Sequence, residues 1–268
     1  MRRELIGKGG TASVYRGRDE ALARDVAIKL YPPARDALDA QRQEAEVNVL
    51  AGLSHHSLIT LFDAGVDRSD AENVKIYLVM ELITGTDLQK TIAAGPISAE
   101  HIGQIGYDIA EGLQYIHHNG VVHRDVKPSN ILMVDYGDES TRARAKLTDF
   151  GIATYRGSAS IAEVGVTTGT AAYLSPEQVR RAAVGPATDI YSLGLVLLEC
   201  FNRALAFPGT PVESALARLE HAPEIPASLS PAWRSALAAM TASDPAARPV
   251  ASDLVVMMRD LVIAETVA

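Results

Sequence analysis

The first ninety residues alternate between short β-rich segments and polar turns. Segments rich in β-branched and apolar residues, separated by Gly, Pro and charged turns, predict strands at about residues 13–16, 25–30, 58–65 and 75–82. One helix is expected to interrupt them at about residues 36–53, where Val47, Leu50 and Leu53 have helical spacing. This part of the chain is therefore expected to be built mainly on a β-sheet.

Helical periodicity replaces this pattern after Gly85. Apolar residues at steps of three and four predict a long amphipathic helix that includes Ile102, Ile105, Ile109, Leu113 and Ile116. Further helices are expected at about residues 187–202, 212–220, 230–242 and 252–263, each opening near a Ser, Thr, Asp or Pro. The pattern predicts an α+β chain with a small β-rich lobe at about residues 1–82, a hinge at about 80–85, and a larger helical lobe at about 86–265.

Composition is that of an ordinary globular protein. The 268 residues are 47% apolar and 22% charged, and 25 basic against 33 acidic side chains give a formal net charge of −8. This balance argues against a nucleic-acid partner, which needs clustered positive charge. The single cysteine, Cys200, cannot form a disulfide within the chain, which suits a cytoplasmic protein. No apolar run approaches the ~20 residues that cross a bilayer, so we expect no membrane segment in this chain.

A glycine-rich turn occupies residues 6–14 and contains Gly7, Gly9 and Gly10. Glycine lets the backbone approach phosphate oxygens closely, although an ordinary hairpin turn fits this segment equally well. It is not a Walker A loop, because no Gly-Lys-Ser/Thr sequence closes it. A later expected strand ends in Lys29, which would either bind phosphate as a point charge or lie exposed at a sheet edge.

Three motifs further along the chain decide between these interpretations. Residues 123–130 read His-Arg-Asp-Val-Lys-Pro-Ser-Asn and bring an acid, a base and an amide into one short loop. Residues 149–151 (Asp-Phe-Gly) and 175–177 (Ser-Pro-Glu) follow in that order. With the glycine-rich turn and Lys29, this ordered set resembles that of the eukaryotic-type (Hanks-type) serine/threonine protein kinases, particularly their bacterial members. The resemblance covers residues 6 to about 261 and implies one protein kinase domain over residues 1–268, with the bilobal kinase fold.

The resemblance implies an ATP site formed by the glycine-rich turn, Lys29 and the hinge. The family's third glycine is replaced here by Ala12, which adds one methyl group. Lys29 would pair with a carboxylate of the first helix, and Glu46 is preferred over Glu44 because it lies nine residues before His55. The expected nucleotide-contacting residues are Ile6, Gly7, Lys8, Gly9, Gly10, Val14, Ala27, Lys29, Met80, Glu81, Ile83, Asp87 and Leu132. Asp87 would bind the ribose or, equally well, cap a helix.

The resemblance also implies phosphoryl transfer from ATP to a protein hydroxyl. Asp125 would accept the hydroxyl proton, and Lys127 would offset charge on the γ-phosphoryl group. Hard oxygen ligands favour Mg²⁺, with Mn²⁺ as an alternative, over zinc. The expected catalytic residues are Lys29, Glu46, Asp125, Lys127 and Asn130, and the expected metal ligands are Asn130 and Asp149.

Two positions of the resemblance indicate serine/threonine specificity. Lys127, two residues after the expected base, is typical of this subgroup, and Thr170 is expected to bond toward the catalytic residues. The resemblance further implies a buried ion pair between Glu177 and Arg248, and a role for Asp189 in bracing the catalytic loop.

Arg124, directly before the expected base, marks kinases of this family that are switched by phosphorylation. A phosphate near Arg124 would form charge-assisted hydrogen bonds and order the activation loop, residues 152–169. We expect autophosphorylation at Thr167 or Thr168, with a slight preference for Thr167. Protein substrates are the expected partners, and a homodimer is one expected route to activation.

Other interpretations fit parts of the pattern. A pseudokinase would have the fold without activity, but the expected catalytic residues are all present. A small-molecule phosphotransferase of the aminoglycoside or choline type would lack the peptide-binding shelf that the resemblance assigns to residues 175–177 and Arg248. A metal site at His117, His118 and His123 is disfavoured, because His123 belongs to the catalytic-loop motif. If this chain is part of a longer protein, that protein could be anchored in a membrane.

Overall fold

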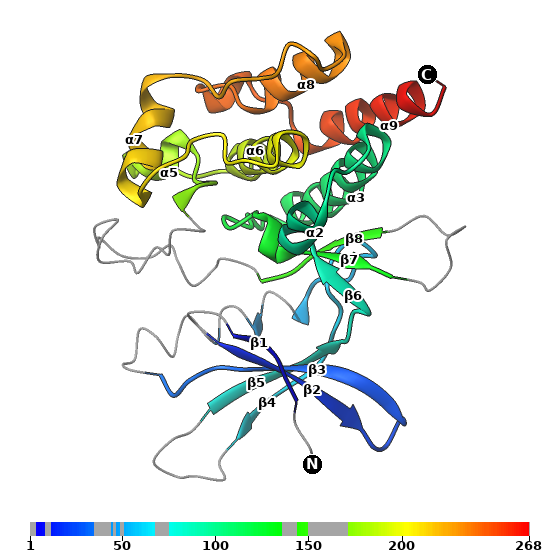
Figure 1. Ribbon diagram of the computed structural model, residues 1–268. Helices are drawn as coiled ribbons and strands as arrows, with labels where there is room; N and C mark the ends of the chain where they lie inside the picture. Colours follow the sequence, from blue (N-terminus) through cyan, green and yellow to red (C-terminus); the bar gives the residue numbers. More distant parts are fainter. Residues whose placement is uncertain are drawn as a thin grey trace. The chain divides into compact units, whose positions relative to one another are not determined.

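The structure is a computed structural model that describes residues 4–8, 12–34, 44, 47–48, 51–67, 75–135, 144–149 and 171–267 (Figure 1). The chain divides into two compact units, Met1–Thr84 and Gly85–Ala268. The first is built on a β-sheet and the second is mainly helical, so the expected α+β class is confirmed.

Antiparallel strands form the five-stranded sheet of the first unit in the order β1-β2-β3-β5-β4. Their bounds are β1 (Glu4–Lys8), β2 (Ser13–Asp19), β3 (Arg24–Leu30), β4 (Leu61–Asp67) and β5 (Lys75–Glu81). β3 is the middle strand and pairs Ala27 with Met80 of β5 and Lys29 with Leu78. All four of these residues are at most 7% exposed, because a central strand is covered on both edges and its apolar face packs inward.

For the strand expected at residues 58–65, the predicted first residue is wrong. β4 begins at Leu61 and continues to Asp67, because the Leu58 backbone N–H donates to the His55 carbonyl in a turn, at 3.0 Å. Leu58 is only 1% exposed, so its apolar character reflects burial rather than a strand. Of the helix expected at 36–53, the described residues 44, 47, 48 and 51 are helical, whereas residues 52 and 53 are not, so the expected end is two residues too late. The remainder lies outside the described residues.

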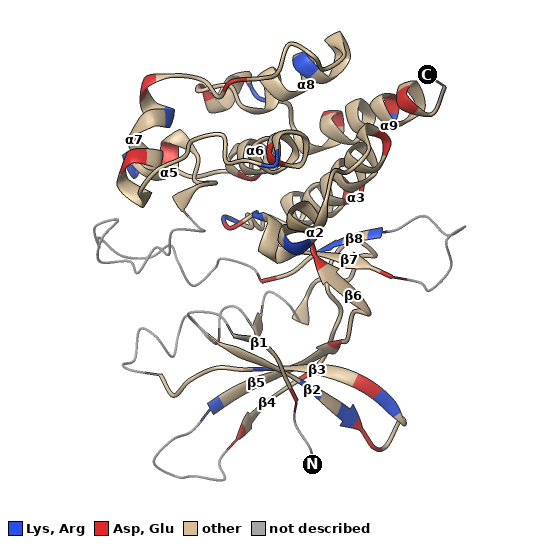
Figure 2. Ribbon diagram, viewed as in Figure 1, with Lys and Arg blue, Asp and Glu red and all other residues tan. Residues whose placement is uncertain are grey.

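Figure 2 shows acidic and basic residues side by side along β2 and β3. Arg16 and Arg18 contact Asp25 at 2.6 and 3.2 Å, and Arg24 contacts Asp19 at 3.2 Å. Exposed pairs of this kind contribute little stability each. They do neutralise one another, so this hairpin presents no clustered positive charge of the kind that binds nucleic acid.

The second unit begins with a three-stranded sheet of β6 (Gly85–Asp87), β7 (Ile131–Val134) and β8 (Arg144–Leu147), in that order. The pattern of apolar residues had not indicated these short strands. The helices described are α2 (Leu88–Ala94), α3 (Ala99–His118), α5 (Pro176–Arg180), α6 (Ala187–Asn202), α7 (Pro211–Glu220), α8 (Pro231–Met240) and α9 (Ala251–Val267), with 3-10 turns η1 (Pro128–Asn130) and η3 (Pro245–Ala247). None of the described helices is long and apolar enough to cross a membrane.

Helix α6 is the centre of the second unit. It is apolar around most of its circumference, and twelve of its sixteen residues are buried, as expected for a helix packed on several sides. Helices α3 and α9 lie along one another (Figure 1). Gly106 of α3 permits this close approach, since a Cβ there would lie 2.7 Å from Met258 Sδ of α9 and 3.1 Å from Leu197 Cδ1 of α6.

Candidate active site

A loop without regular secondary structure, residues 121–127, carries the expected catalytic aspartate between α3 and η1. The Lys127 Nζ atom lies 2.7 Å from Asp125 Oδ2. Asn130 Nδ2 donates to the same oxygen at 3.0 Å and to the Asp125 carbonyl at 2.9 Å. The side chains of Asp125 and Lys127 are 20% and 18% exposed, so solvent reaches both. Three of the expected catalytic residues therefore form one cluster.

The imidazole of His123 supports this loop from inside. The residue is 0% exposed, and burial lowers its pKa below the ordinary 6.5 although nearby carboxylates oppose the shift. The ring is therefore neutral at pH 7. One tautomer satisfies both of its contacts: Nε2–H donates to the Thr148 carbonyl at 3.1 Å, and Nδ1 accepts the Asp125 backbone N–H at 3.3 Å.

Asp189, in the first turn of α6, holds the backbone of the same loop. Its Oδ2 accepts the N–H of His123 at 2.9 Å, and its Oδ1 accepts the N–H of Arg124 at 2.7 Å. His117 Nε2 also lies 2.7 Å from Oδ2. Asp189 is 0% exposed, and these three contacts offset the cost of burying its charge. The contacts to His123 and Arg124 are the arrangement expected of a residue that braces the catalytic loop.

Asp149 follows β8 and lies beside Asn130, whose Nδ2 is 3.5 Å from the Asp149 carbonyl oxygen. Its φ of +57° is uncommon for a residue with a side chain and is typical of functional sites. Because the Asn130 amide nitrogen takes the internal contacts, its oxygen Oδ1 lies on the other side of the group. This oxygen and the Asp149 carboxylate are hard donors of the type that Mg²⁺ prefers, so the two residues fit the expected metal.

Two of the three histidines considered as an alternative metal site have other contacts. His117 and His123 are occupied by Asp189 and Thr148, as described above. Within the described ranges, no group of three or more His, Cys, Asp and Glu side chains is placed to hold a metal ion. Two ligands suit Mg²⁺, which usually combines one or two protein carboxylates with substrate phosphates and water.

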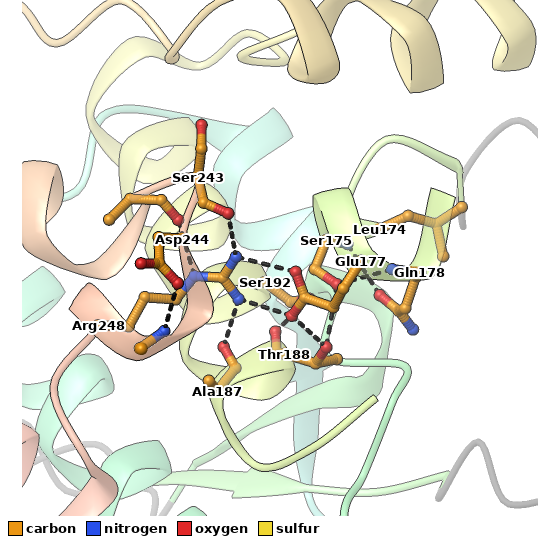
Figure 3. Close-up of polar contacts among 12 residues, drawn as sticks. Leu174, Ser175, Glu177, Gln178, Ala187, Thr188, Ser192, Ser243, Asp244 and Arg248 are labelled. Carbon is orange, nitrogen blue, oxygen red and sulfur yellow. Dashed lines mark hydrogen bonds and ion pairs between the residues drawn. The ribbon is translucent and has the colours of Figure 1, made fainter. Parts of the chain in front are cut away.

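The expected ion pair of Glu177 and Arg248 is present and buried (Figure 3). The two guanidinium N–H groups donate to the two carboxylate oxygens at 2.7 and 2.9 Å, and Thr188 Oγ1 donates to Glu177 Oε1 at 2.6 Å. Burial alone raises the pKa of Glu177. The hydrogen bonds from Arg248 and Thr188 outweigh that effect, so the pKa lies below the ordinary 4.5.

Two residues that the sequence motifs did not single out hold the segment that precedes and opens α5. Arg218 of α7, 1% exposed, donates to the Leu174 carbonyl and, at 3.3 Å, to the Ala172 carbonyl. Within the described part of the chain it has no carboxylate partner, and burial lowers its pKa to about 10, so it is still a cation at pH 7. Gln178 contacts both Ser175 and the catalytic loop. The spacing of Ser175 and Gln178 is a capping-box signature, whereas nothing in the sequence marks Arg218.

In the first unit, the expected nucleotide-contacting residues gather on one part of the sheet. Ala27 and Lys29 are two residues apart on β3 and therefore share a face. Val14 of β2 pairs with Lys29 and also with Gly7 of β1. Glu81, at the end of β5, is fixed because its Oε1 accepts the Thr60 N–H at 2.7 Å.

Asp87 was expected either to bind ribose or to cap a helix, and the structure shows the cap. Its side chain accepts the Lys90 N–H at 2.8 Å at the start of α2, and Lys90 Nζ lies 2.9 Å from its other oxygen. Leu132 of β7 pairs with Asp87 of β6.

A sequence model described as "Protein kinase domain" matches residues 1–258 of the chain. The chain belongs to the protein kinase family. This confirms the family that the motifs indicated, and the two units are the β-rich and helical parts of the kinase fold.

Curated proteins similar to this kinase domain include bacterial serine/threonine-protein kinases. The serine/threonine-protein kinase PknL of Mycobacterium tuberculosis is 38% identical over 98% of this chain and 65% of its own length. PknB of Mycobacterium leprae is 36% identical over 82% of this chain and 35% of its own length. PknA of Mycobacterium tuberculosis is 33% identical over 91% of this chain and 56% of its own. The chain thus spans less than two thirds of the length of these relatives.

Several expected site residues of the kinase domain lie outside the described residues. They are Gly9, Gly10, Glu46, Thr167, Thr168 and Thr170. Their expected contacts, including the pairing of Lys29 with Glu46, therefore stay predictions. Ile6, Gly7 and Lys8 lie on β1, Met80 lies on β5 and Ile83 lies two residues after β5. Their contacts with a nucleotide also stay predictions.

Proposed function

We propose that this chain is a serine/threonine protein kinase that transfers the γ-phosphoryl group of ATP to Ser or Thr hydroxyls of proteins. The cluster of Asp125, Lys127 and Asn130 is the observation that supports this most strongly. Both side-chain contacts of the Asp125 carboxylate fall on Oδ2. Its Oδ1 has no hydrogen-bond partner among the described residues and can therefore accept the proton of a substrate hydroxyl.

In the proposed reaction, the substrate oxygen forms a bond to the γ-phosphorus as the bond to the ADP oxygen breaks. Asp125 Oδ1 takes the hydroxyl proton, so the attacking oxygen does not carry it into the product. Lys127, held 2.7 Å from Asp125, places an ammonium group where charge develops on the transferred phosphoryl group. Lys29 would hold the α- and β-phosphates, as the resemblance to the kinase family implies.

ATP and Mg²⁺, or Mn²⁺, are the proposed cofactors. A divalent ion bound with ATP neutralises charge on the β- and γ-phosphates. Asn130 Oδ1 and the Asp149 carboxylate would hold it, as the hard-oxygen chemistry of these two groups favours. Asn130 would thereby orient the metal through one atom and Asp125 through the other.

Serine/threonine specificity is supported by Lys127 and by the relatives, which are named serine/threonine-protein kinases. We further propose autophosphorylation at Thr167 or Thr168. Arg124 is the cation that would bind the resulting phosphate.

The test is transfer of labelled phosphate from ATP to a generic basic protein, with Mg²⁺ or Mn²⁺, by the wild type and by Asp125→Asn. Labelled Ser or Thr with the wild type and none with the variant is the expected result. Equal labelling by both would overturn the role of Asp125. Labelling of choline or an aminoglycoside in place of the protein would favour a small-molecule phosphotransferase. ATP binding without phosphate transfer would favour a pseudokinase. Mapping the phosphosites by mass spectrometry decides between Thr167 and Thr168.

A further inference from the structure

The residue directly before the proposed base has an unfavourable backbone conformation. Arg124 has φ of +69°, in the left-handed region, which costs a residue with a side chain roughly 1–2 kcal/mol. Such a conformation persists only where the surroundings fix it. Its N–H donates to Asp189 Oδ1 at 2.7 Å, and its carbonyl accepts the Gln178 Nε2–H at 3.0 Å. The backbone N–H and the backbone carbonyl of Arg124 are therefore both held by buried side chains.

The hydrogen bond from Gln178 holds the peptide group that joins Arg124 to Asp125. The Arg124 carbonyl and the Asp125 N–H belong to one rigid plane, because the peptide bond does not rotate freely. Gln178 holds the oxygen of this plane and His123 Nδ1 accepts its N–H at 3.3 Å. If the contact with Gln178 is lost, the plane loses the shorter of these two hydrogen bonds and is held less firmly. Rotation of the plane would displace Asp125.

Gln178 suits this task because its amide is both an acceptor and a donor. Its Oε1 accepts the Ser175 N–H at 2.8 Å and completes the capping box of α5, while its Nε2 donates to the catalytic loop. The residue is 8% exposed, so water does not easily replace either contact. A glutamate at this position could still form the cap but would have no N–H to donate.

We propose that Gln178 is a positioning residue of the kinase, which links the start of α5 to the backbone that carries Asp125. This inference rests on the proposed function, because Asp125 is the proposed base. It predicts that the donor atom of Gln178 controls turnover, whereas the acceptor atom controls only the stability of α5.

Gln178→Glu separates the two atoms, since it keeps the acceptor and removes the donor. Glu213→Gln is its matched control, because Glu213 completes the capping box of α7 by accepting the Thr210 N–H at 2.8 Å, away from the catalytic loop. We expect Gln178→Glu to lower kcat by on the order of tenfold or more, with the KM for ATP within about twofold. Glu213→Gln should change neither value by more than about twofold.

The inference is overturned if Gln178→Glu retains wild-type kcat, or if both variants lose activity in proportion to their melting temperatures. Gln178→Met, which removes the donor without adding a charge, should lower kcat as well and serves if the glutamate variant does not fold. Hydrogen exchange over residues 121–127 gives a readout that does not need turnover. It should be faster in Gln178→Glu than in the wild type, and equal rates would overturn the inference. If the wild type transfers no phosphate, the proposed function fails, and exchange still decides the role of Gln178.

Discussion

Glu177 and Arg248 form a two-pronged ion pair although they are 71 residues apart in the sequence. Their side chains are 6% and 0% exposed. Further guanidinium contacts go to the backbone carbonyls of Ala187, Ala242 and Ser243, at 2.9, 2.8 and 3.4 Å. Arg248 thus ties the first turn of α5 to the first residue of α6 and to the segment that follows α8, which fixes the segment on which Gln178 lies.

Removing the charge of Glu177 should destabilise the protein strongly. Glu177→Gln leaves Arg248 as a buried cation without a counter-charge, and breaking a buried pair in this way costs about 3–5 kcal/mol. The free energy of unfolding, measured by urea denaturation, should fall by that amount. Asp260→Asn is the control, because Arg259 and Asp260 are 57% and 63% exposed, and it should change stability by less than about 0.5 kcal/mol. A loss below about 1 kcal/mol for Glu177→Gln would show that the pair matters little.

The buried Glu177 and the half-buried Glu199 should affect the pH dependence of stability in opposite directions. The pKa of Glu177 is lowered, so its contribution is present above pH 4.5 and is lost as the pH falls through the lowered pKa. Burial raises the pKa of Glu199, although the hydroxyl of Tyr173 donates to it, so its contribution is present below pH 4.5 and is lost as the pH rises through the raised pKa.

The corresponding amide variants test these signs. Glu177→Gln should flatten the loss of stability on acidification below pH 4.5. Glu199→Gln should flatten the loss on going above that pH. The measurement is the free energy of unfolding between about pH 3 and 8. If it changes with pH equally in the wild type and a variant, the direction of the pKa shift given for that glutamate is contradicted.

Asp189→Asn should lower turnover more than nucleotide binding. The carboxylate accepts from two consecutive backbone N–H groups and lies against His117 Nε2, whereas the amide of asparagine would direct an NH₂ group at one of these donors. The catalytic loop should shift, and a displacement of about 1 Å costs on the order of 100-fold in kcat. Steady-state kinetics should show this loss with a much smaller change in the KM for ATP. A KM increase at unchanged kcat would instead indicate a role in binding.

Residues close together in the sequence were the part of the site that motifs could predict. Asp125, Lys127 and Asn130 fall within six residues, so their order alone indicates one cluster. The contact of Gln178 with Arg124 spans 54 residues, and that of Arg218 with Leu174 spans 44. Contacts of this kind depend on how α5, α7 and the loop pack together, and no local spacing encodes them. The start of β4 was missed for a related reason, because burial in a turn and burial in a strand select the same apolar residues.

Close packing of α6 should make Gly194 intolerant of a methyl group. A Cβ there would lie 2.8 Å from Thr241 Cγ2 and 2.9 Å from Met240 Cβ, and the second atom cannot move without the α8 backbone. Overpacking costs about 1–3 kcal/mol, while replacing a helical glycine by alanine gains about 1 kcal/mol. Because the clash with Met240 Cβ places the cost toward the upper end of that range, Gly194→Ala should lose up to about 2 kcal/mol overall. Gly95→Ala is the matched control, since its Cβ would meet nothing within 4 Å and its φ of 173° suits any residue. Urea denaturation should show a loss for Gly194→Ala alone. Equal stability of the two variants would mean that α8 yields to the added methyl group.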